Sequence, residues 1–192
     1  MTHHHGSVAA AFALAFVSLA VAAVGQMPAS AAQGTSVNTV VEDPHYVAVP
    51  LEISVDRPAA EVWRRIGKFC DIGEWMQRPC TIIAGRDGEL GAVRSVGNEV
   101  LVGRTEFSYT YAQPVRADRP YNLYHGTIEA RPITATTSKI VYVLFYDNSM
   151  LPDDAARQEE IATRIERFTQ ALRNMKILAE GGTLEPPDLG GR

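Results

Sequence analysis

Aromatic side chains at alternating positions are the feature of this sequence with the most chemical potential. Three segments, 107–113, 121–131 and 137–147, alternate in the way that β-strands do. The side chains that share the inward-facing parity are Phe107, Tyr109, Tyr111, Tyr124, Ile128, Tyr142, Leu144 and Tyr146. Five of the seven tyrosines therefore point toward one interior space. A phenol joins an apolar ring to a hydroxyl that needs a partner when buried, so this interior suits a ring-bearing or partly polar ligand. Tyrosines packed in a small solid core would give the same pattern, since aromatic residues favour strands.

Acid–base catalysis inside such a space is a second hypothesis. Tyr142 and Tyr146 could transfer protons there, and Arg94 could stabilise an enolate oxygen. These three are the candidate catalytic residues, although an exposed or rim position on a strand is the simpler interpretation of Arg94. Glu99 and Glu106 lie beside turns, so alternation does not say which way they face.

Metal-dependent chemistry is not predicted. Beyond residue 31 the histidines are His45 and His125, which lie far apart in the sequence with no metal-ligand pattern beside either. The nucleophile motif G-x-S-x-G is also lacking. We therefore predict neither a metal nor another cofactor.

The two cysteines, Cys70 and Cys80, are close enough in sequence to pair. Gly73 and Pro79 between them allow the chain to turn back, and an even number of cysteines fits an oxidising compartment. A disulfide is the favoured hypothesis, and two separate buried thiols are the alternative.

The first 41 residues carry no charged side chain. An apolar run over 8–25 and the triplet Ala29-Ser30-Ala31 are typical of a secretory signal peptide. We expect residues 1–31 to be removed after Ala31, leaving no stable membrane span and placing the protein in the periplasm or outside the cell. An uncleaved membrane anchor is the alternative, because the run is just long enough to cross a bilayer.

The net charge of −4, from 18 basic and 22 acidic residues, argues against a nucleic-acid partner.

The remaining pattern predicts one domain over 46–182, preceded by a linker over 32–45 and followed by a disordered tail over 183–192. A strand over 46–56 comes first, then a helix opening at Pro58 and a short helix over 71–76. The six strands that follow are expected at 80–86, 91–96, 99–105, 107–113, 121–131 and 137–147. A last helix, from Asp153 to about Gly181, places Ile161, Ile165, Phe168, Leu172, Met175 and Ala179 on one stripe and Arg164 on the other side.

This order of elements resembles the SRPBCC superfamily, the START-like and polyketide-cyclase-like helix-grip proteins. The resemblance is carried by VPLEISVDRPAAEVWRRIGKFCDIGEWM, then GAVRSV, FSYTY, YHGTIEARP and SKIVYVLFYD, and by the long last helix. It implies an α+β fold, with a curved seven-stranded antiparallel sheet wrapped around the C-terminal helix and two short helices between strands 1 and 2. It also implies an internal cavity, which the inward strand residues would line together with Phe168 and Leu172.

Two functions follow from that resemblance, which alone does not choose between them. The preferred one is an exported protein that binds or carries a small hydrophobic or aromatic molecule, because export separates the chain from cytoplasmic biosynthesis. The alternative is an enzyme like the polyketide cyclases and dehydratases, using cavity Tyr and Arg side chains for acid–base chemistry. On the outer face of the last strand, Val141, Val143 and Phe145 could form a homodimer or membrane contact, or could pack under the linker and tail.

Overall fold

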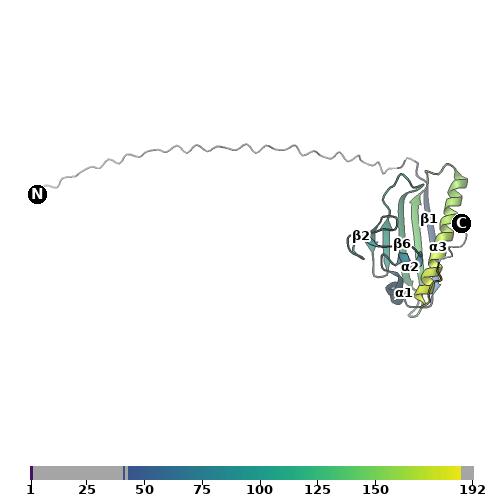
Figure 1. The fold of residues 1–192 in the computed structure, drawn as a ribbon, viewed down its shortest axis with the longest axis horizontal. Helices are drawn as coiled ribbons and strands as arrows, with labels where there is room; N and C mark the ends of the chain where they lie inside the picture. The colour runs from purple at the N-terminus through teal and green to yellow at the C-terminus, as the bar shows by residue number, and fades with distance from the viewer. Residues whose placement is uncertain (2–40, 42, 187–192) are drawn as a thin grey trace. The chain divides into compact units, whose positions relative to one another are not determined.

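The computed structural model describes residues 1, 41 and 43–186. In chain order the elements are β1 (Tyr46–Val55), α1 (Ala59–Ile66), α2 (Ile72–Trp75), β2 (Ile82–Ala84), β3 (Val93–Arg94), β4 (Glu99–Arg104), β5 (Ser108–Ala112), β6 (Asn122–Pro132), β7 (Ser138–Asp147) and α3 (Asp154–Ala179). The seven strands form one curved antiparallel sheet, and α3 runs along its concave face (Figure 1). The predicted α+β helix-grip fold, with two short helices between the first two strands, is confirmed.

The sheet has the order β1-β7-β6-β5-β4-β3-β2, so the first strand closes against the last. Its longest pairings join β7 to both neighbours: Tyr46 lies opposite Asp147 at one end of the β1–β7 pair, and Val55 lies opposite Ser138 at the other. From β2 to β7 each strand pairs with the strand that follows it in the sequence. This arrangement places β5, β6 and β7 side by side. The inward side chains of the three predicted aromatic segments therefore lie on the same face of the sheet.

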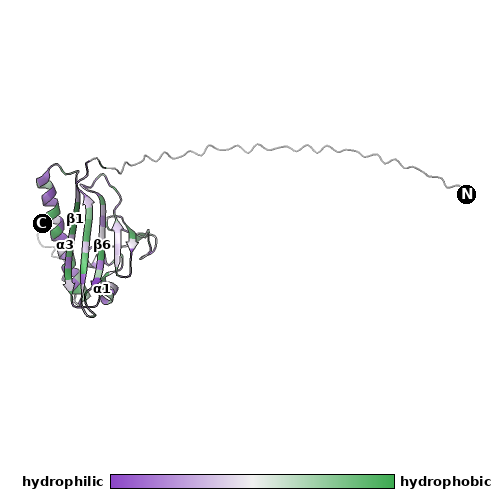
Figure 2. Ribbon diagram, turned by 180° about the vertical axis from the view of Figure 1, so that it is seen from behind, coloured by the Kyte–Doolittle hydropathy of each residue, from purple (hydrophilic) through white to green (hydrophobic). Residues whose placement is uncertain are grey.

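The strands alternate between apolar and polar residues, as Figure 2 shows on β1 and β6. On β7 the inward residues Ile140, Tyr142, Leu144 and Tyr146 are all fully buried. On the outer face Val141 and Val143 are half-buried, while Phe145 stays 40% exposed and stacks on Tyr46 with ring centroids 5.4 Å apart. Phe145 and Tyr46 thus cover part of each other across the β1–β7 pair. A dimer or membrane role for the outer residues of β7 stays a prediction.

Strands β2 and β3 are much shorter than the predicted segments 80–86 and 91–96. Gly85, Gly88 and Gly91 all adopt positive φ angles, a conformation that glycine reaches without steric cost. The chain between β2 and β3 is consequently a series of turns. Alternation in the sequence did not reveal how far those turns extend.

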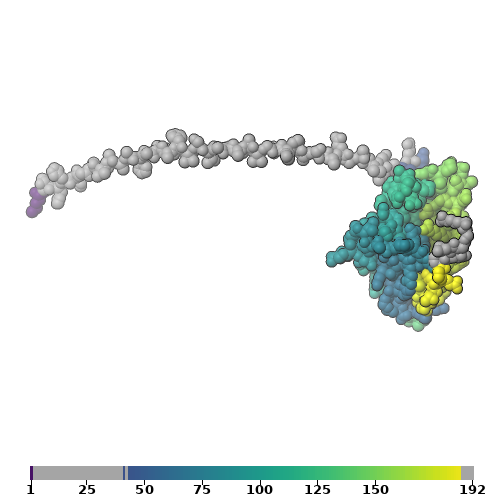
Figure 3. All heavy atoms as spheres, viewed as in Figure 1, coloured from purple at the N-terminus to yellow at the C-terminus, as the bar shows by residue number. Residues whose placement is uncertain are grey.

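Helix α3 begins where Asp153 accepts a hydrogen bond from the backbone N–H of Ala156 at 2.9 Å. Its C-terminal half is buried against β1, α1 and α2, and Figure 3 shows its yellow end beside the blue α1–α2 segment. The side chain of Asn174 donates to the Trp75 carbonyl at 2.9 Å across this contact. Of the predicted buried stripe, Phe168, Leu172, Met175 and Ala179 are buried. Ile161 is only half-buried and Ile165 is 40% exposed, because Glu160 and Arg164 are the residues of this part of α3 that contact the sheet.

Cys70 and Cys80 form a disulfide, with their Cα atoms 5.5 Å apart, so the alternative of two separate thiols is wrong. Within the described residues no helix has the length and apolar character needed to cross a membrane. The predicted signal peptide, residues 1–31, lies outside the described residues apart from Met1. The same is true of most of the 32–45 linker and of residues 187–192 in the predicted tail.

Candidate functional site

The interior between the sheet and α3 is built from phenols. Tyr109 and Tyr111 come from β5, Tyr124 from β6, and Tyr142 and Tyr146 from β7. All five are at most 3% exposed. The hydroxyls of Tyr111 and Tyr142 lie 2.7 Å apart and satisfy each other. Ile128 and Leu144 are buried among them, and Phe107 packs at the edge of the cluster, half-buried.

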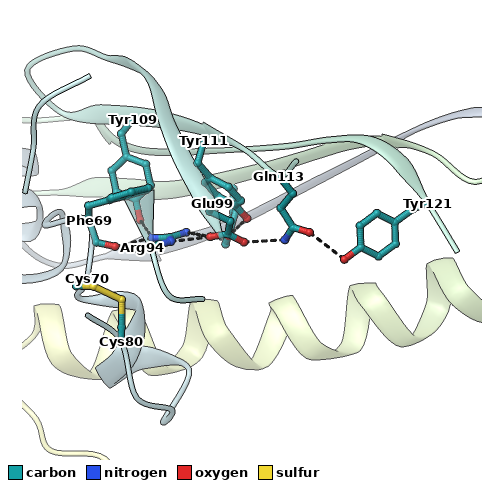
Figure 4. A network of polar contacts seen from close by, with 10 residues as sticks. Phe69, Cys70, Cys80, Arg94, Glu99, Tyr109, Tyr111, Gln113 and Tyr121 are labelled. Atoms are coloured by element: carbon teal, nitrogen blue, oxygen red, sulfur yellow. Dashed lines mark hydrogen bonds and ion pairs between the residues drawn. A yellow bond between two sulfur atoms is a disulfide. The ribbon is translucent and has the colours of Figure 1, made fainter. Parts of the chain in front are cut away.

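Arg94 lies in the centre of this interior, with no exposed surface (Figure 4). The preferred interpretation of Arg94 as a rim or exposed residue is therefore wrong. Arg94 pairs with Glu99 in the β3–β4 register, and its Nε lies 2.6 Å from Glu99 Oε2. Its Nη1 donates to the Phe69 carbonyl at 2.5 Å and to the Tyr109 hydroxyl at 3.2 Å. The guanidinium also lies between the rings of Phe69 and Tyr111, 4.3 and 4.6 Å from their centroids.

A polar chain runs outward from this ion pair (Figure 4). Gln113 donates to Glu99 Oε1 at 2.8 Å, and the Tyr121 hydroxyl donates to Gln113 Oε1 at 2.9 Å. Burial raises the pKa of Glu99, and the neighbouring Arg94 opposes that rise. The alternation in the sequence did not determine whether the Glu99 side chain points into the interior or toward solvent. The structure turns it inward and leaves Glu106 exposed.

A second ion pair, Arg164 with Glu160 on α3, faces the same interior. Arg164 Nε donates to Glu160 Oε1 at 2.7 Å, and the Tyr146 hydroxyl donates to Glu160 Oε2 at 2.7 Å. The guanidinium lies over the rings of Tyr146, Tyr121 and Tyr124, at 4.4, 4.9 and 5.1 Å from their centroids. We predicted that Arg164 would lie on the outer side of the helix, and this prediction is wrong.

Arg164 could have been found from its spacing. It lies three residues after Ile161 and four before Phe168, which is the spacing of one helical face. Its charge suggested the solvent side, but a buried guanidinium is stable when a carboxylate and aromatic rings surround it.

Tyr121 is the other interior residue that alternation missed. Its parity matches His125, which would place it outward. The register of β6 shifts between Asn122 and His125, and Leu123 takes a φ of +51°. This β-bulge reverses the facing of the preceding residue, so Tyr121 packs against Tyr124 with centroids 5.1 Å apart. No glycine in the sequence marks the bulge.

The buried phenols are held in their protonated form. Burial raises the pKa of Tyr124 to about 12 and raises the pKa values of Tyr111 and Tyr142 well above 10.0. Burial, and then the hydrogen bond to Glu160, also raise the pKa of Tyr146. At neutral pH these groups are hydrogen-bond donors that can polarise a carbonyl or stabilise an enolate, but they are not bases.

A small cavity of about 130 Å³ lies at the outer end of this cluster, bounded by strands on one side and α3 on the other. Three of the predicted ligand-binding residues line it: Tyr111, Tyr124 and Phe168. Glu99, Gln113, Tyr121 and Arg164 line it too. It adjoins a wider hollow of about 470 Å³, which we call the vestibule, and the two share Arg119, Tyr121, Arg164, Arg167 and Phe168.

The other predicted ligand-binding residues do not line this cavity. Ile128, Tyr142, Leu144, Tyr146 and Leu172 are buried in the packed core. Tyr109 lines a different pocket beside α1. Arg94 lines neither the cavity nor the vestibule, and its hydrogen bonds go to Phe69, Glu99 and Tyr109. Among the described residues no group of three His, Cys, Asp or Glu side chains is arranged to hold a metal ion.

A curved sheet closed around one long helix, with a polar and aromatic cavity between them, defines a helix-grip protein. The chain belongs to the family described as polyketide cyclase/dehydrase and lipid transport, whose model matches residues 46–180. This membership confirms the predicted SRPBCC relationship. No curated protein sequence matches the chain significantly.

Solved structures with the same fold support this assignment. A solution structure of a protein from Thermobifida fusca is 22% identical, with a TM-score of 0.58, and the match covers 72% of this chain and 97% of that one. The Zhui aromatase/cyclase from Streptomyces sp. R1128 is 17% identical, with a TM-score of 0.55, and the match covers 72% of this chain and 100% of that one. The di-domain ARO/CYC BexL, from the BE-7585A biosynthetic pathway, is 20% identical, with a TM-score of 0.50, over 70% of this chain and 46% of its own. At these identities the likeness is one of fold.

Proposed function

We propose that this protein is an exported carrier that binds a small aromatic or hydrophobic molecule between the sheet and α3. The observation that carries the proposal is the tyrosine-walled cavity of about 130 Å³ opening into the vestibule of about 470 Å³. A dry cavity of roughly 150 Å³ holds a benzene-sized ring. One ring of the ligand therefore fits inside, and the rest of the molecule lies in the vestibule.

The polar groups around the cavity favour a ligand that carries oxygen atoms. Tyr121, Gln113 and Arg164 offer hydroxyl, amide and guanidinium groups at its walls. Arg119 and Arg167 add positive charge where the cavity meets the vestibule. A few fixed polar groups in an aromatic pocket are the usual means of orienting a small ligand.

Carriage fits this interior better than catalysis does. Arg94, Tyr142 and Tyr146, the three candidate catalytic residues, lie in the packed core rather than at the cavity wall. Glu99 and Glu160 each have an arginine partner, which holds the carboxylate in place. Tyr111 and Tyr124, the phenols with raised pKa values that line the cavity, are donors at neutral pH. A binding site needs such donors, whereas an enolising enzyme also needs a base.

The cyclase- or dehydratase-like enzyme stays as the second candidate because Glu160, which accepts from Tyr146, lines the vestibule. In that role the Glu160 carboxylate would take a proton from the carbon between two carbonyls of a 1,3-diketone, leaving an enolate. Deuterium exchange at that carbon should then be fast with the protein and abolished in Glu160→Gln. Exchange at the rate of buffer alone would remove this candidate.

The carrier proposal is tested by native mass spectrometry of the full chain purified from its own host. We expect a co-purifying small molecule that is lost in Tyr121→Ala, because Tyr121 lines both the cavity and the vestibule. Tyr46→Ala is the matched control, since Tyr46 is 54% exposed on the outer face of the sheet. A wild-type protein with no bound mass, or a bound mass unchanged in Tyr121→Ala, would contradict the proposal.

Export is tested on the same material by the mass of the mature chain. Removal of the apolar segment should leave Ala32 as the first residue. The disulfide agrees with an oxidising compartment. A mass that includes residues 1–31 would contradict cleavage.

A further inference from the structure

A separate pocket of about 460 Å³ lies beside the C-terminal end of α1, and we call it the α1-end pocket. Its apolar walls are Trp63, Phe69, Leu101 and Tyr109. It shares no lining residue with the cavity or the vestibule. The Arg94 network lies between them, since Tyr109 lines this pocket with its ring and accepts from Arg94 with its hydroxyl.

The aromatic wall of the α1-end pocket is held by packing. The ring of Trp63 lies 5.6 Å from that of Tyr109, between centroids, and folds back over Gly67. A Cβ at Gly67 would lie 2.5 Å from Trp63 Cδ2, so the indole rests where a side chain would otherwise be. Phe69 packs edge-on against Tyr109, with centroids 5.5 Å apart. Phe69 and Tyr109 are buried, at 1% and 3% exposure, so they support the partly exposed indole of Trp63, which a flat ring entering this pocket would meet.

The rim of the pocket is positively charged. Arg64 from α1, Lys68 from the chain after it and Arg104 from β4 line the pocket, with Asp87 as the one acidic lining residue. In the described part of the chain, none of the three basic side chains forms an ion pair. A hydrogen bond from Arg104 Nη1 to the Gly88 carbonyl holds that guanidinium at the rim. Three basic groups against one acidic group favour an anion.

We propose that the α1-end pocket is a second binding site, for a small aromatic anion whose ring lies against Trp63 and whose carboxylate or sulfonate meets Lys68 and Arg104. This site does not depend on the interior cavity. Its ligand is defined by the juxtaposition of an aromatic wall and an unpaired basic rim.

Naphthalene-2-sulfonate, titrated into the isotope-labelled full chain and followed by amide chemical shifts, tests the proposal. Saturable shifts are expected at Gly67, Gly88 and Ser108, which line the pocket. Shifts confined to Gly97 and Gln113, which line the interior cavity, would overturn the proposal, as would the lack of any saturable shift.

Charge recognition is tested by variants and by a neutral probe. The double variant Lys68→Ala/Arg104→Ala should bind the sulfonate about tenfold or more weakly, the scale of one lost charge-assisted contact. Arg86→Ala is the matched control, because Arg86 pairs with Glu89 and does not line the pocket. Naphthalene-2-sulfonamide, which has the same ring without the charge, should also bind about tenfold more weakly. Equal affinity for the two probes, or an unaffected double variant, would overturn the proposal.

Discussion

The ring of Tyr111 occupies the space directly over Gly126, its partner in the β5–β6 pair. A Cβ at Gly126 would lie 2.3 Å from Tyr111 Cζ and 2.4 Å from the hydroxyl oxygen. The missing side chain on β6 is thus what allows the phenol to lie against the sheet and reach Tyr142 at 2.7 Å. One glycine in the longest strand sets the position of the central tyrosine pair.

Gly126→Ala should therefore destabilise the protein by about 1–3 kcal/mol, the usual cost of forcing extra atoms into a packed core. The new methyl group must displace the Tyr111 ring, which separates it from Tyr142. Urea unfolding measures the effect. Gly103→Ala is the control, because a Cβ there meets its nearest neighbour at an ordinary 3.6 Å. Equal stability of the two variants would show that the Tyr111 ring can move at no cost.

Removing one member of the buried pair Arg94–Glu99 should cost about 3–5 kcal/mol, because the other charge is left without its partner in the interior. Arg94→Met and Glu99→Leu are the single variants, and urea unfolding is again the measurement. The double variant should be more stable than either single one, since no uncompensated charge remains. The exposed Arg86→Met gives the baseline for removing a surface arginine. A double variant less stable than both single ones would contradict a charge-based explanation.

Stability should fall in alkali as the buried tyrosines ionise. In the unfolded chain a tyrosine loses its proton near the ordinary pKa of 10.0, whereas burial raises the pKa of Tyr124 to about 12 in the folded protein. Between these values the native state holds more protons than the unfolded state, so the free energy of unfolding decreases as pH rises. Burial raises the pKa values of Tyr109, Tyr111, Tyr142 and Tyr146 too, which adds to the effect.

Near-ultraviolet phenolate absorbance and far-ultraviolet circular dichroism, recorded together over this pH range, check the prediction. A large part of the phenolate signal should appear only with loss of secondary structure. Full ionisation of the tyrosines in a protein that keeps its circular dichroism would contradict the burial argument. Tyr124→Phe should lessen the loss of stability between pH 10.0 and about 12.

Loss of the disulfide should lower the free energy of unfolding by about 3 kcal/mol, from the loop-closure entropy of a ten-residue separation. The variant is Cys70→Ala/Cys80→Ala, compared with wild type by thermal and urea unfolding. An additional effect on the Arg94 network is expected, because Phe69, whose carbonyl accepts from Arg94, directly precedes Cys70. A variant as stable as wild type would assign the disulfide no structural role.

The fold was predictable because each of its main elements has a strong local pattern. Alternation in 121–131 and 137–147 identified the long central strands, and the inward Tyr124, Tyr142 and Tyr146 came from it directly. The 3.6-residue period placed Phe168, Leu172 and Met175 on the buried side of α3. The short β2 and β3 were overestimated because their ends depend on turn geometry more than on side-chain pattern.

The polar part of the site was harder to predict. Tyr121 required a bulge that the sequence does not mark. The spacing of Arg164 pointed inward, but accepting an inward arginine there, or at Arg94, required knowing that a carboxylate and aromatic rings would surround it. The aromatic rings come from other elements, Glu99 comes from the neighbouring strand, and Glu160 lies one turn before Arg164 on α3. Charge alone suggests solvent exposure, so a buried ion pair is a property of the assembled fold.

The short distance between Arg94 and Glu99 along the chain has a consequence for the order of folding. The two residues face each other across the β3–β4 hairpin and are separated by only five positions. Because so short a loop closes at little entropic cost, we expect this contact to form before the distant pairing of β1 with β7. In that order the arginine meets its carboxylate while water still surrounds both, and the two charges would enter the closing core as a neutral unit.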